Sequence, residues 1–242
     1  MPRSNSITPK QKIAIKNKTT VFTNKVINAA DYVGNVLKLA EHNAKLGNGK
    51  SIIQKGKLKG APLYYLTLEE RATCPTDCMH YYDCYGNSAW MATRFKANSA
   101  LCTKIKQEVA ILSGQYKKFL VRLHILGDFF SPQYVKLWSD LVEKHDELYI
   151  FGYTAWHSGP IYEAIRENLL TKMGRVNIRF SVDNWGLDSF DSFDSIPHMF
   201  ASSEDYSGNS ITCPEQLDKT DSCLTCGLCY NNGTNTIKFL NH

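Results

Sequence analysis

Apolar runs and amphipathic stretches alternate through the middle of the chain. The runs at 117–130, 147–156 and 175–184 are nearly continuous in apolar and β-branched residues, which is typical of strands buried on both faces. Between them, 131–145 and 159–173 have the three- and four-residue periodicity of helices. Strands separated by helices of about a dozen residues predict parallel βαβ units, which build either a doubly wound sheet or a (β/α) barrel.

The first half of the chain predicts further elements. Residues 29–47 predict a helix, because apolar residues recur at three- and four-residue spacing and Gly47 supplies a stop. The stretch 62–69 predicts a strand, and 87–115 predicts helix in two pieces. Ser131 is the predicted N-cap of the helix that follows it, with proline at the first helical position.

These elements predict three parts of an α/β protein. Residues 1–60 are expected to form a basic arm and a helix. Residues 61–200 are expected to form a core of parallel βαβ units, arranged as a partial or complete (β/α) TIM-like barrel. Residues 201–242 are expected to form a cysteine-rich segment packed on that core.

Charge is unevenly distributed along the chain. The net charge is +5, but residues 1–60 carry 12 Lys or Arg against two acids, a net of +10. Such a basic segment can neutralise the phosphates of nucleic acid or form an ordinary solvated surface. Lysines alone do not decide between the two. No stretch approaches the roughly 20 apolar residues that span a bilayer, and the start lacks the apolar core of a secretory signal. We therefore expect a cytoplasmic protein without a membrane partner, in the host cytoplasm if it is viral.

The eight cysteines fall mainly into two groups. Cytoplasmic thiols stay reduced, so the cysteines predict a metal site rather than a disulfide framework. The first group, Cys-x3-Cys-x5-Cys, follows the predicted strand at 62–69, and the second, Cys-x9-Cys-x2-Cys-x2-Cys, lies near the end. Cys102 stands alone within a predicted helix and is expected to belong to the core. The predicted metal ligands are Cys74, Cys78, Cys84, Cys213, Cys223, Cys226 and Cys229.

The spacing favours an iron–sulfur cluster over zinc. Cys-x2-Cys-x2-Cys is the ligand run of ferredoxins, although all-cysteine sets also suit tetrahedral zinc. Three thiolates leave one iron of a [4Fe–4S] cluster open to a substrate, S-adenosylmethionine or water, whereas four thiolates close it. The two groups either hold one cluster each or combine across the chain to hold a single cluster, and the sequence leaves both arrangements open.

Seven short motifs occur in order over about residues 40–235. Together they resemble the phage and plasmid "gene product eighty-eight" family of cysteine-rich proteins, and the resemblance implies that the cysteines ligate a cluster. The motifs are NAKLG (43–47), CPTDCMHYYDCYG (74–86), RF (94–95), VRLHILGDF (121–129), FGYTAW (151–156), RFSVD (179–183) and CLTCGLCY (223–230).

A more distant resemblance is to radical S-adenosylmethionine enzymes. Those enzymes place three cluster cysteines after the first strand of a partial (β/α) barrel, where Cys74, Cys78 and Cys84 stand here. Their usual spacing is Cys-x3-Cys-x2-Cys, whereas the second gap is five residues in this chain. The resemblance implies that S-adenosylmethionine binds, with Gly127 and Asp128 standing for the motif that holds its amino group.

Polar residues at the predicted strand ends are the candidates for chemistry near the cluster. In a parallel α/β fold such residues face the ligand site, where a carboxylate or imidazole can orient a substrate or move a proton. Each can equally be a cap or a satisfied core residue. The candidates are Asp128, His124, Ser181 and Asp183 for catalysis and Gly127 and Thr154 for cofactor binding.

Three functions remain open at this point. The first is an enzyme with an open cluster at the mouth of a radical S-adenosylmethionine-like barrel. The second is a non-redox hydrolase, such as an esterase, that uses an open iron as Lewis acid, since the chain lacks a Gly-x-Ser-x-Gly elbow and a P-loop. The third is a nucleic-acid-binding protein in which residues 1–60 contact the nucleic acid and the cluster is structural. The acidic and aromatic stretch 183–208 is expected to form a loop over the site.

Overall fold

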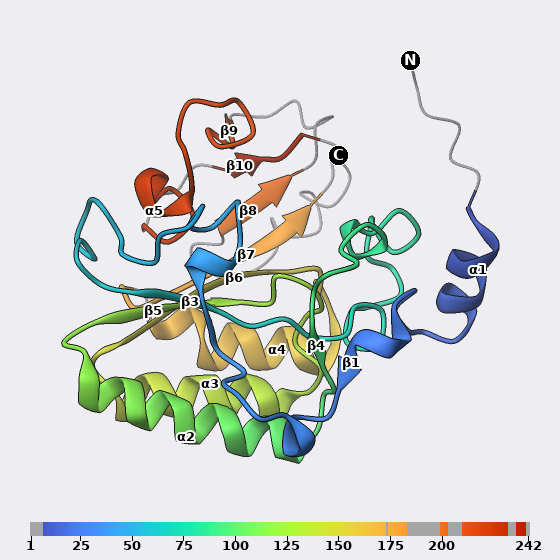
Figure 1. The fold of residues 1–242 in the computed structure, drawn as a ribbon, viewed down its shortest axis with the longest axis horizontal. Helices are drawn as coiled ribbons and strands as arrows, with labels where there is room; N and C mark the ends of the chain where they lie inside the picture. The colour runs from blue at the N-terminus through green and yellow to red at the C-terminus, as the bar shows by residue number, and fades with distance from the viewer. Residues whose placement is uncertain (1–6, 173, 183–198, 203–209, 232–235, 241–242) are drawn as a thin grey trace.

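Parallel strands form one mixed sheet that organises the chain (Figure 1). The computed structural model describes residues 7–172, 174–182, 199–202, 210–231 and 236–240. Neighbouring strands of the eight-stranded sheet pair in parallel except for β2, which pairs antiparallel with β3. In spatial order the strands are β2 (Lys38–Leu39), β3 (Leu63–Tyr65), β5 (Phe119–Leu123), β6 (Leu148–Thr154), β7 (Val176–Val182), β8 (Met199–Ser202), β10 (Thr236–Lys238) and β9 (Ser210–Thr212).

Three helices cover one face of this sheet. They are α2 (Ser99–Gln115), α3 (Pro132–Lys144) and α4 (Gly159–Asn168), which lie below the strands in Figure 1. Phe119, Val121 and Leu123 of β5 belong to the core on this side, as alternation along a strand requires. A second, two-stranded sheet joins β1 (Val26–Ile27) to β4 (Arg94–Phe95), and α1 (Pro9–Lys16) lies apart at the N-terminal end.

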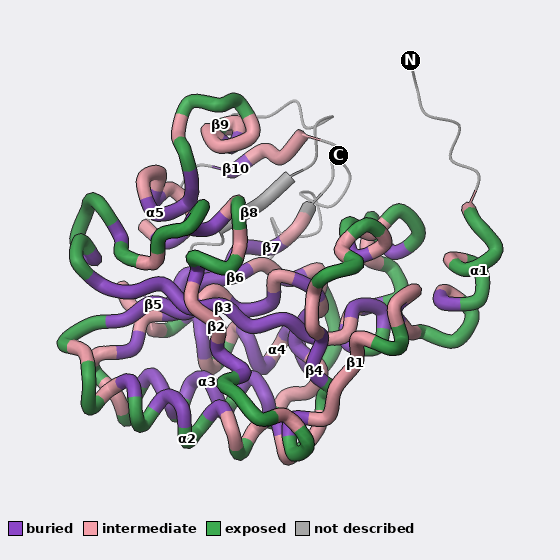
Figure 2. The backbone as a smooth tube through the Cα atoms, in the orientation of Figure 1, coloured by how far each residue is buried: buried purple, intermediate pink, exposed green. Residues whose placement is uncertain are grey.

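The opposite face of the sheet carries a second core. Leu120 of β5 and Phe151 of β6 point to this side and pack with Leu224 and Tyr230 of the C-terminal segment. The short helix α5 (Cys223–Cys226) lies in this upper layer (Figure 1), and the central strands are buried along most of their length (Figure 2). Burial on both faces explains why the strands are nearly continuous apolar runs.

The predicted βαβ units of the middle of the chain are confirmed. Strands β5, β6 and β7 alternate with α3 and α4, and Ser131 caps α3 by accepting a hydrogen bond from the Tyr134 N–H at 3.1 Å. Barrel closure is not confirmed, because β2 and β9 stand at opposite edges of the sheet formed by the described strands. The described strands therefore form an open α/β sheet. None of the described helices is long and apolar enough to cross a membrane.

The helix predicted over 29–47 is wrong. The segment instead forms two 3₁₀ turns, η2 (Ala29–Asp31) and η3 (Ala40–His42), with β2 between them. The side chain of Glu108 in α2 accepts hydrogen bonds from the N–H groups of Val36 and Leu37 at 2.7 and 2.8 Å. In a helix, the N–H groups of Val36 and Leu37 would bond to backbone carbonyls four residues earlier. Here they bond to Glu108 instead, so tertiary contacts override the helical periodicity of the sequence.

Only the second part of the helix predicted over 87–115 forms, as α2. The first part is a turn-rich loop that leads into β4. The guanidinium of Arg94 donates to the carbonyls of Gly86, Ala89 and Ala92, at 3.0, 3.1 and 2.8 Å. A buried side chain thus replaces the helical partners of these carbonyls.

Candidate metal centre

The first cysteine group lies at the carboxyl edge of the parallel strands. Its loop, residues 74–84, follows β3, while Asp128 follows β5 and Thr154 ends β6. The thiols of Cys74 and Cys78 interact electrostatically with each other, with Cys84 and with Asp128. Cys74 and Cys78 thus lie within electrostatic reach of the predicted carboxylate, and the loop that carries all three cysteines stands at the edge of the sheet where α/β proteins bind ligands.

Burial dominates the electrostatics of these three thiols. Desolvation raises the pKa of Cys74 and Cys84, and it raises the pKa of Cys78 to about 12. In each case a backbone N–H of the loop opposes the rise, donated by Arg71 to Cys74, by His80 to Cys78 and by Gly86 to Cys84. The Gly86 nitrogen lies 3.3 Å from the Cys84 sulfur. Hydrogen bonds from backbone N–H groups to cysteine sulfur stabilise the thiolate form.

A buried ion pair holds the loop in place. Glu70 accepts hydrogen bonds from Arg94 Nε at 2.7 Å and Arg94 Nη2 at 3.1 Å, and both side chains are fully buried. The Thr20 hydroxyl donates to the same carboxylate at 2.6 Å. Because Arg94 also binds the carbonyl of Gly86, the pair connects the strand before the cysteines to the turn after them.

Arg71 brings a second buried cation to the cysteine loop. It takes a positive φ of 62°, donates from Nε to the Tyr81 carbonyl at 3.0 Å and from Nη2 to Asn87 at 2.6 Å. Its third nitrogen, Nη1, is buried and has no hydrogen-bond acceptor among the described residues. Arg71 lowers the pKa of Cys84, so the guanidinium stabilises negative charge on that sulfur.

Asp128 and Thr154 lie together beside the thiols, as predicted for strand-end residues. The Asp128 carboxylate accepts hydrogen bonds from the N–H groups of Phe129 and Ala155, both at 2.7 Å, and from the Thr154 hydroxyl. Burial raises its pKa to about 7 despite these bonds. A carboxyl group that exchanges its proton near neutral pH is suited to move a proton at this edge.

Gly127, the other predicted cofactor-binding residue, lies where two loops pack closely. Its φ is +81°, and a Cβ there would come within 2.6 Å of both Leu68 Cβ and Thr73 Oγ1. The Thr73 hydroxyl in turn accepts the Asp128 N–H at 3.0 Å. The glycine thus allows the loop after β5 to pack against the strand end before the cysteines.

Replacing Gly127 with alanine is expected to lower the free energy of unfolding by about 2–4 kcal/mol, through strain at positive φ and the close contacts. Urea unfolding followed by circular dichroism measures the change. Gly114→Ala in α2 is the matched control, because a Cβ there meets no atom within 4 Å. That variant is expected to gain about 0.5–1 kcal/mol. Equal stabilities of the two variants would contradict the packing role.

His124 contacts the helical layer. Its Nε2 lies 3.1 Å from the Tyr134 hydroxyl, and its ring packs edge-on against Phe129 at a centroid distance of 4.8 Å. Complete burial lowers its pKa to about 3, so the imidazole stays neutral in the folded protein. These contacts give His124 a place in the core between the sheet and α3.

The neutral imidazole predicts a pH effect on stability. Between pH 6.5 and about 3 the unfolded chain binds a proton at His124 and the folded chain does not, so stability falls as the pH falls. Relative to His124→Gln, the wild-type free energy of unfolding should fall by about 1.4 kcal/mol per pH unit below pH 6. Urea unfolding of both proteins at several pH values measures this difference. Parallel pH profiles of the two proteins would contradict the buried neutral state.

The two remaining catalytic candidates are placed differently. Ser181 of β7 alternates with Ile178 and Phe180 of the helix-side core, which puts it on the opposite face of the sheet, toward the C-terminal layer. Asp183 and most of the predicted loop at 183–208 lie outside the described residues.

The second cysteine group lies over the sheet face that the C-terminal segment covers. Cys213, Cys223, Cys226 and Cys229 together line one small cavity. Cys223 and Cys229 interact electrostatically with Arg122 of β5, which lowers the pKa of both against the larger effect of burial. Arg122 Nε is buried and has no hydrogen-bond acceptor among the described residues. Gly227 ends α5 with a φ of 78°, and this turn allows the chain to bring Cys229 back toward Cys223.

The two groups lie apart. In Figure 1, α5 is on the left of the upper layer, whereas the loop between β3 and β4 is on the right. The eight cysteines are free thiols. Among the described residues, no three His, Cys, Asp or Glu side chains stand close enough to coordinate one metal ion. Ligand cysteines of a [4Fe–4S] cluster each bind a different iron, so the donor set of each group fits a cluster in number and chemistry.

The sequence gives little sign of the residues that support the cysteines. In the sequence Glu70, Arg71, Arg94 and Arg122 look like ordinary charged residues. Only the structure shows that the first three are buried and that the Nε atom of Arg122 is buried. Arg71 and Glu70 directly follow the predicted strand at 62–69, and a charged pair between a buried strand and a cysteine loop is the one local signal that could have identified them.

Comparisons with known proteins give phage relatives. The chain is 25% identical over 132 residues to "Gene 88 protein" of Mycobacterium phage L5, covering 49% of this chain and 53% of the phage protein. It is 25% identical over 127 residues to "Gene 88 protein" of Mycobacterium phage D29, covering 46% and 51%. The chain thus spans about half the length of these curated relatives. No family model and no solved structure matches it. The matches support the resemblance to gene 88-like phage proteins. They give no support to the resemblance to radical S-adenosylmethionine enzymes.

Proposed function

We propose that this chain is an iron–sulfur protein in which Cys74, Cys78 and Cys84 hold a [4Fe–4S] cluster. The observation that carries the proposal is that three partly buried cysteines lie in one short loop, where backbone N–H groups of Arg71, His80 and Gly86 lower the pKa of the three thiols against the effect of burial. Three unligated thiols need no such donors, whereas cluster-bound thiolates are stabilised by them.

The charge around the loop supports the same proposal. A cluster with three thiolates is an anion, and burying it requires positive charge nearby. Arg71 supplies a buried guanidinium whose Nη1 has no acceptor among the described residues, and it already favours the thiolate of Cys84. An unpartnered buried N–H is costly unless something accepts its hydrogen bond, and cluster or thiolate sulfur can be that acceptor.

The position of the loop favours an enzyme over a purely structural cluster. When bound, a cluster held by three thiolates offers one iron to a further ligand, such as S-adenosylmethionine or a substrate oxygen. Two residues of the chain would act beside the cluster. Asp128, with a pKa of about 7, exchanges a proton near neutral pH, and Thr154 orients the Asp128 carboxylate. Both stand at the carboxyl edge of the parallel strands, the edge at which α/β proteins bind ligands.

The second group is proposed to hold a separate, closed cluster. Four cysteines line one cavity in a layer that covers the sheet, and Arg122 faces two of them. Four thiolates leave no iron open, so this cluster would fasten residues 213–230 to the sheet. Zinc is the less favoured metal for this group, because Cys-x2-Cys-x2-Cys is a ligand run of iron–sulfur proteins.

Metal and sulfide analysis of anaerobically purified protein tests these proposals. We expect about eight irons and about eight sulfides per chain, with no stoichiometric zinc. About four of each would leave one cluster and contradict the second site. Zinc without sulfide would contradict both.

The open iron has its own test. The EPR spectrum of the reduced protein should change on addition of S-adenosylmethionine or of a small anion such as cyanide, and Cys78→Ala should remove the responsive signal. A spectrum that responds to neither ligand would contradict an open iron while leaving the metal analysis standing.

A further inference from the structure

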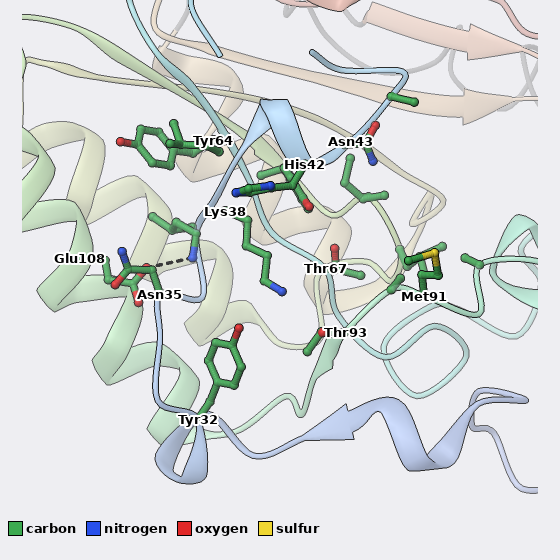
Figure 3. Close-up of a pocket in the computed structure, with 18 of the residues that line it drawn as sticks. Tyr32, Asn35, Lys38, His42, Asn43, Tyr64, Thr67, Met91, Thr93 and Glu108 are labelled. Carbon is green, nitrogen blue, oxygen red and sulfur yellow. Dashed lines mark hydrogen bonds between the residues drawn. The ribbon is translucent and has the colours of Figure 1, made fainter. Parts of the chain in front are cut away.

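A cavity of about 850 Å³ opens beside the first cysteine loop (Figure 3). Its walls come from the edge strand β2, from α2 and from the turn-rich loop that follows Cys84. The volume lies in the range of small-molecule and cofactor pockets. Neither cysteine group lines it, so it is a site of its own.

Aromatic side chains surround this cavity. Tyr64 and Tyr65 of β3, Tyr32, Tyr85 and Trp90 all line it. Trp90 is 62% exposed, so a large aromatic surface remains available to a ligand. Exposed aromatic rings beside a hollow offer stacking partners to a planar ring.

The charge of the cavity favours an anion. Lys38 extends into it, with Nζ 5.5 Å from the centre of the Tyr32 ring and pointing toward the side of Thr93 (Figure 3). Glu108 is the one carboxylate among the described lining residues, and its two oxygens accept the N–H groups of Val36 and Leu37. Among the described residues, no carboxylate lies within the 4.0 Å of an ion pair with Lys38.

The positive charge continues outside the cavity. Residues 1–60, which supply Tyr32 and Lys38, carry a net charge of +10. The hydroxyls of Thr19 and Thr20 bind Glu69 and Glu70, which fixes the end of the basic N-terminal segment to the base of the cysteine loop. A polyanion that reaches the cavity would thus meet a favourable field on the approach.

We propose that this cavity binds a nucleotide unit of a single-stranded nucleic acid, with the base stacked on Trp90 and the phosphate beside Lys38. Aromatic platforms combined with a positive surface are the features with which proteins bind single strands without reading sequence. The amide group of Asn35 and the hydroxyl of Thr93 also line the cavity, where they can form hydrogen bonds to the base or sugar. This inference goes beyond the cluster and does not depend on it.

Fluorescence anisotropy with a labelled 12-residue oligodeoxythymidylate tests the proposal, using full-length protein of measured iron content. Binding should weaken about tenfold in Trp90→Ala, since stacking on one aromatic residue is worth about 1–3 kcal/mol. Lys38→Gln should weaken binding and lower the slope of log affinity against log salt by about one. Lys136→Gln is the matched control, because Lys136 is an exposed lysine of α3 that pairs with Asp140 away from the cavity.

Each outcome decides the proposal. Loss of affinity in the Trp90 and Lys38 variants, with the Lys136 variant unchanged, supports it. Absence of binding at low salt, or equal weakening by all three variants, overturns it. Thymidine monophosphate and an extended acidic peptide serve as competitors: full displacement by the monophosphate at the same concentration of nucleotide would assign the cavity to a free nucleotide, and displacement by the peptide alone would assign it to a protein. Either result overturns the binding of a strand.

Discussion

Replacing Cys78 with alanine is expected to reduce the iron of anaerobically purified protein from about eight to about four per chain, with a parallel loss of sulfide. The first cluster has only three cysteine ligands in the wild-type protein. The variant keeps two of them, which are too few to hold a [4Fe–4S] cluster. The buried guanidinium of Arg71 would then lose the cluster anion, so the variant should also unfold at lower urea concentration. Iron and sulfide assays with EPR measure the first effect.

Other cysteine variants make this prediction specific. Cys226→Ala should remove the other half of the iron, because Cys226 lines the second cavity. Cys102→Ala should keep all of it, since Cys102 stands alone in α2 and packs against the helix-side core. A complete loss of iron in both Cys78→Ala and Cys226→Ala would show that the groups share one cluster, against their separation in the structure.

Replacing Glu70 with alanine is expected to destabilise the fold by about 3–5 kcal/mol, because Arg94 would stay buried without its carboxylate. The Glu70–Arg94 contact is 2.7 Å long, and both side chains are fully buried. The loss should be largest around the cysteine loop, since Arg94 also binds the carbonyls of Gly86 and Ala92. Urea unfolding gives the overall effect, and hydrogen exchange of residues 71–95 locates it.

An exposed ion pair supplies the control for Glu70→Ala. Asp140→Ala breaks the Lys136–Asp140 contact on the surface of α3, at a similar distance of 2.8 Å, and should leave the urea midpoint unchanged. Both variants remove one carboxylate from an ion pair, so a difference in their urea midpoints reports the effect of burying the pair. If Glu70→Ala matched Asp140→Ala in stability and iron content, the buried pair would not support the loop.

The sequence predicts well where local pattern and tertiary packing agree. The strands at β5, β6 and β7 and the helices α3 and α4 follow from apolar runs, helical periodicity and the Ser131 cap. The sheet is open among the described strands because the edge strands β2 and β9 do not pair with each other, and no periodicity along the chain reports which strands stand at an edge. Sheet closure depends on contacts between distant strands, which local pattern does not contain.

Residues 29–47 show the opposite case. Their apolar residues do have helical spacing, but the N–H groups of Val36 and Leu37 bond to the Glu108 side chain instead of to helical carbonyls. Glu108 lies more than seventy residues away in the sequence, so local pattern cannot reveal this contact. The apolar residue Val33 is fully exposed as a result. Helical propensity differs between ordinary residues by well under about 1 kcal/mol each, so two buried hydrogen bonds to a charged group outweigh it.

The candidate site divides in the same way. The prediction that Asp128 and Thr154 lie together at a strand edge is confirmed, whereas the seven cysteines remain predicted ligands. The spacing did not reveal Glu70, Arg71 and Arg94, since their partners are set by the loop geometry and not by sequence distance. The sequence does not predict the aromatic cavity beside β2, because it predicts a helix for residues 29–47, which form part of the wall.

Iron-edge anomalous diffraction from anaerobically grown crystals tests the central claim most directly. We expect an anomalous iron peak of cluster size in contact with the sulfurs of Cys74, Cys78 and Cys84, with Arg71 Nη1 directed toward it. A map in which those three sulfurs contact no iron, or in which the peak appears at the zinc edge instead, would contradict the account.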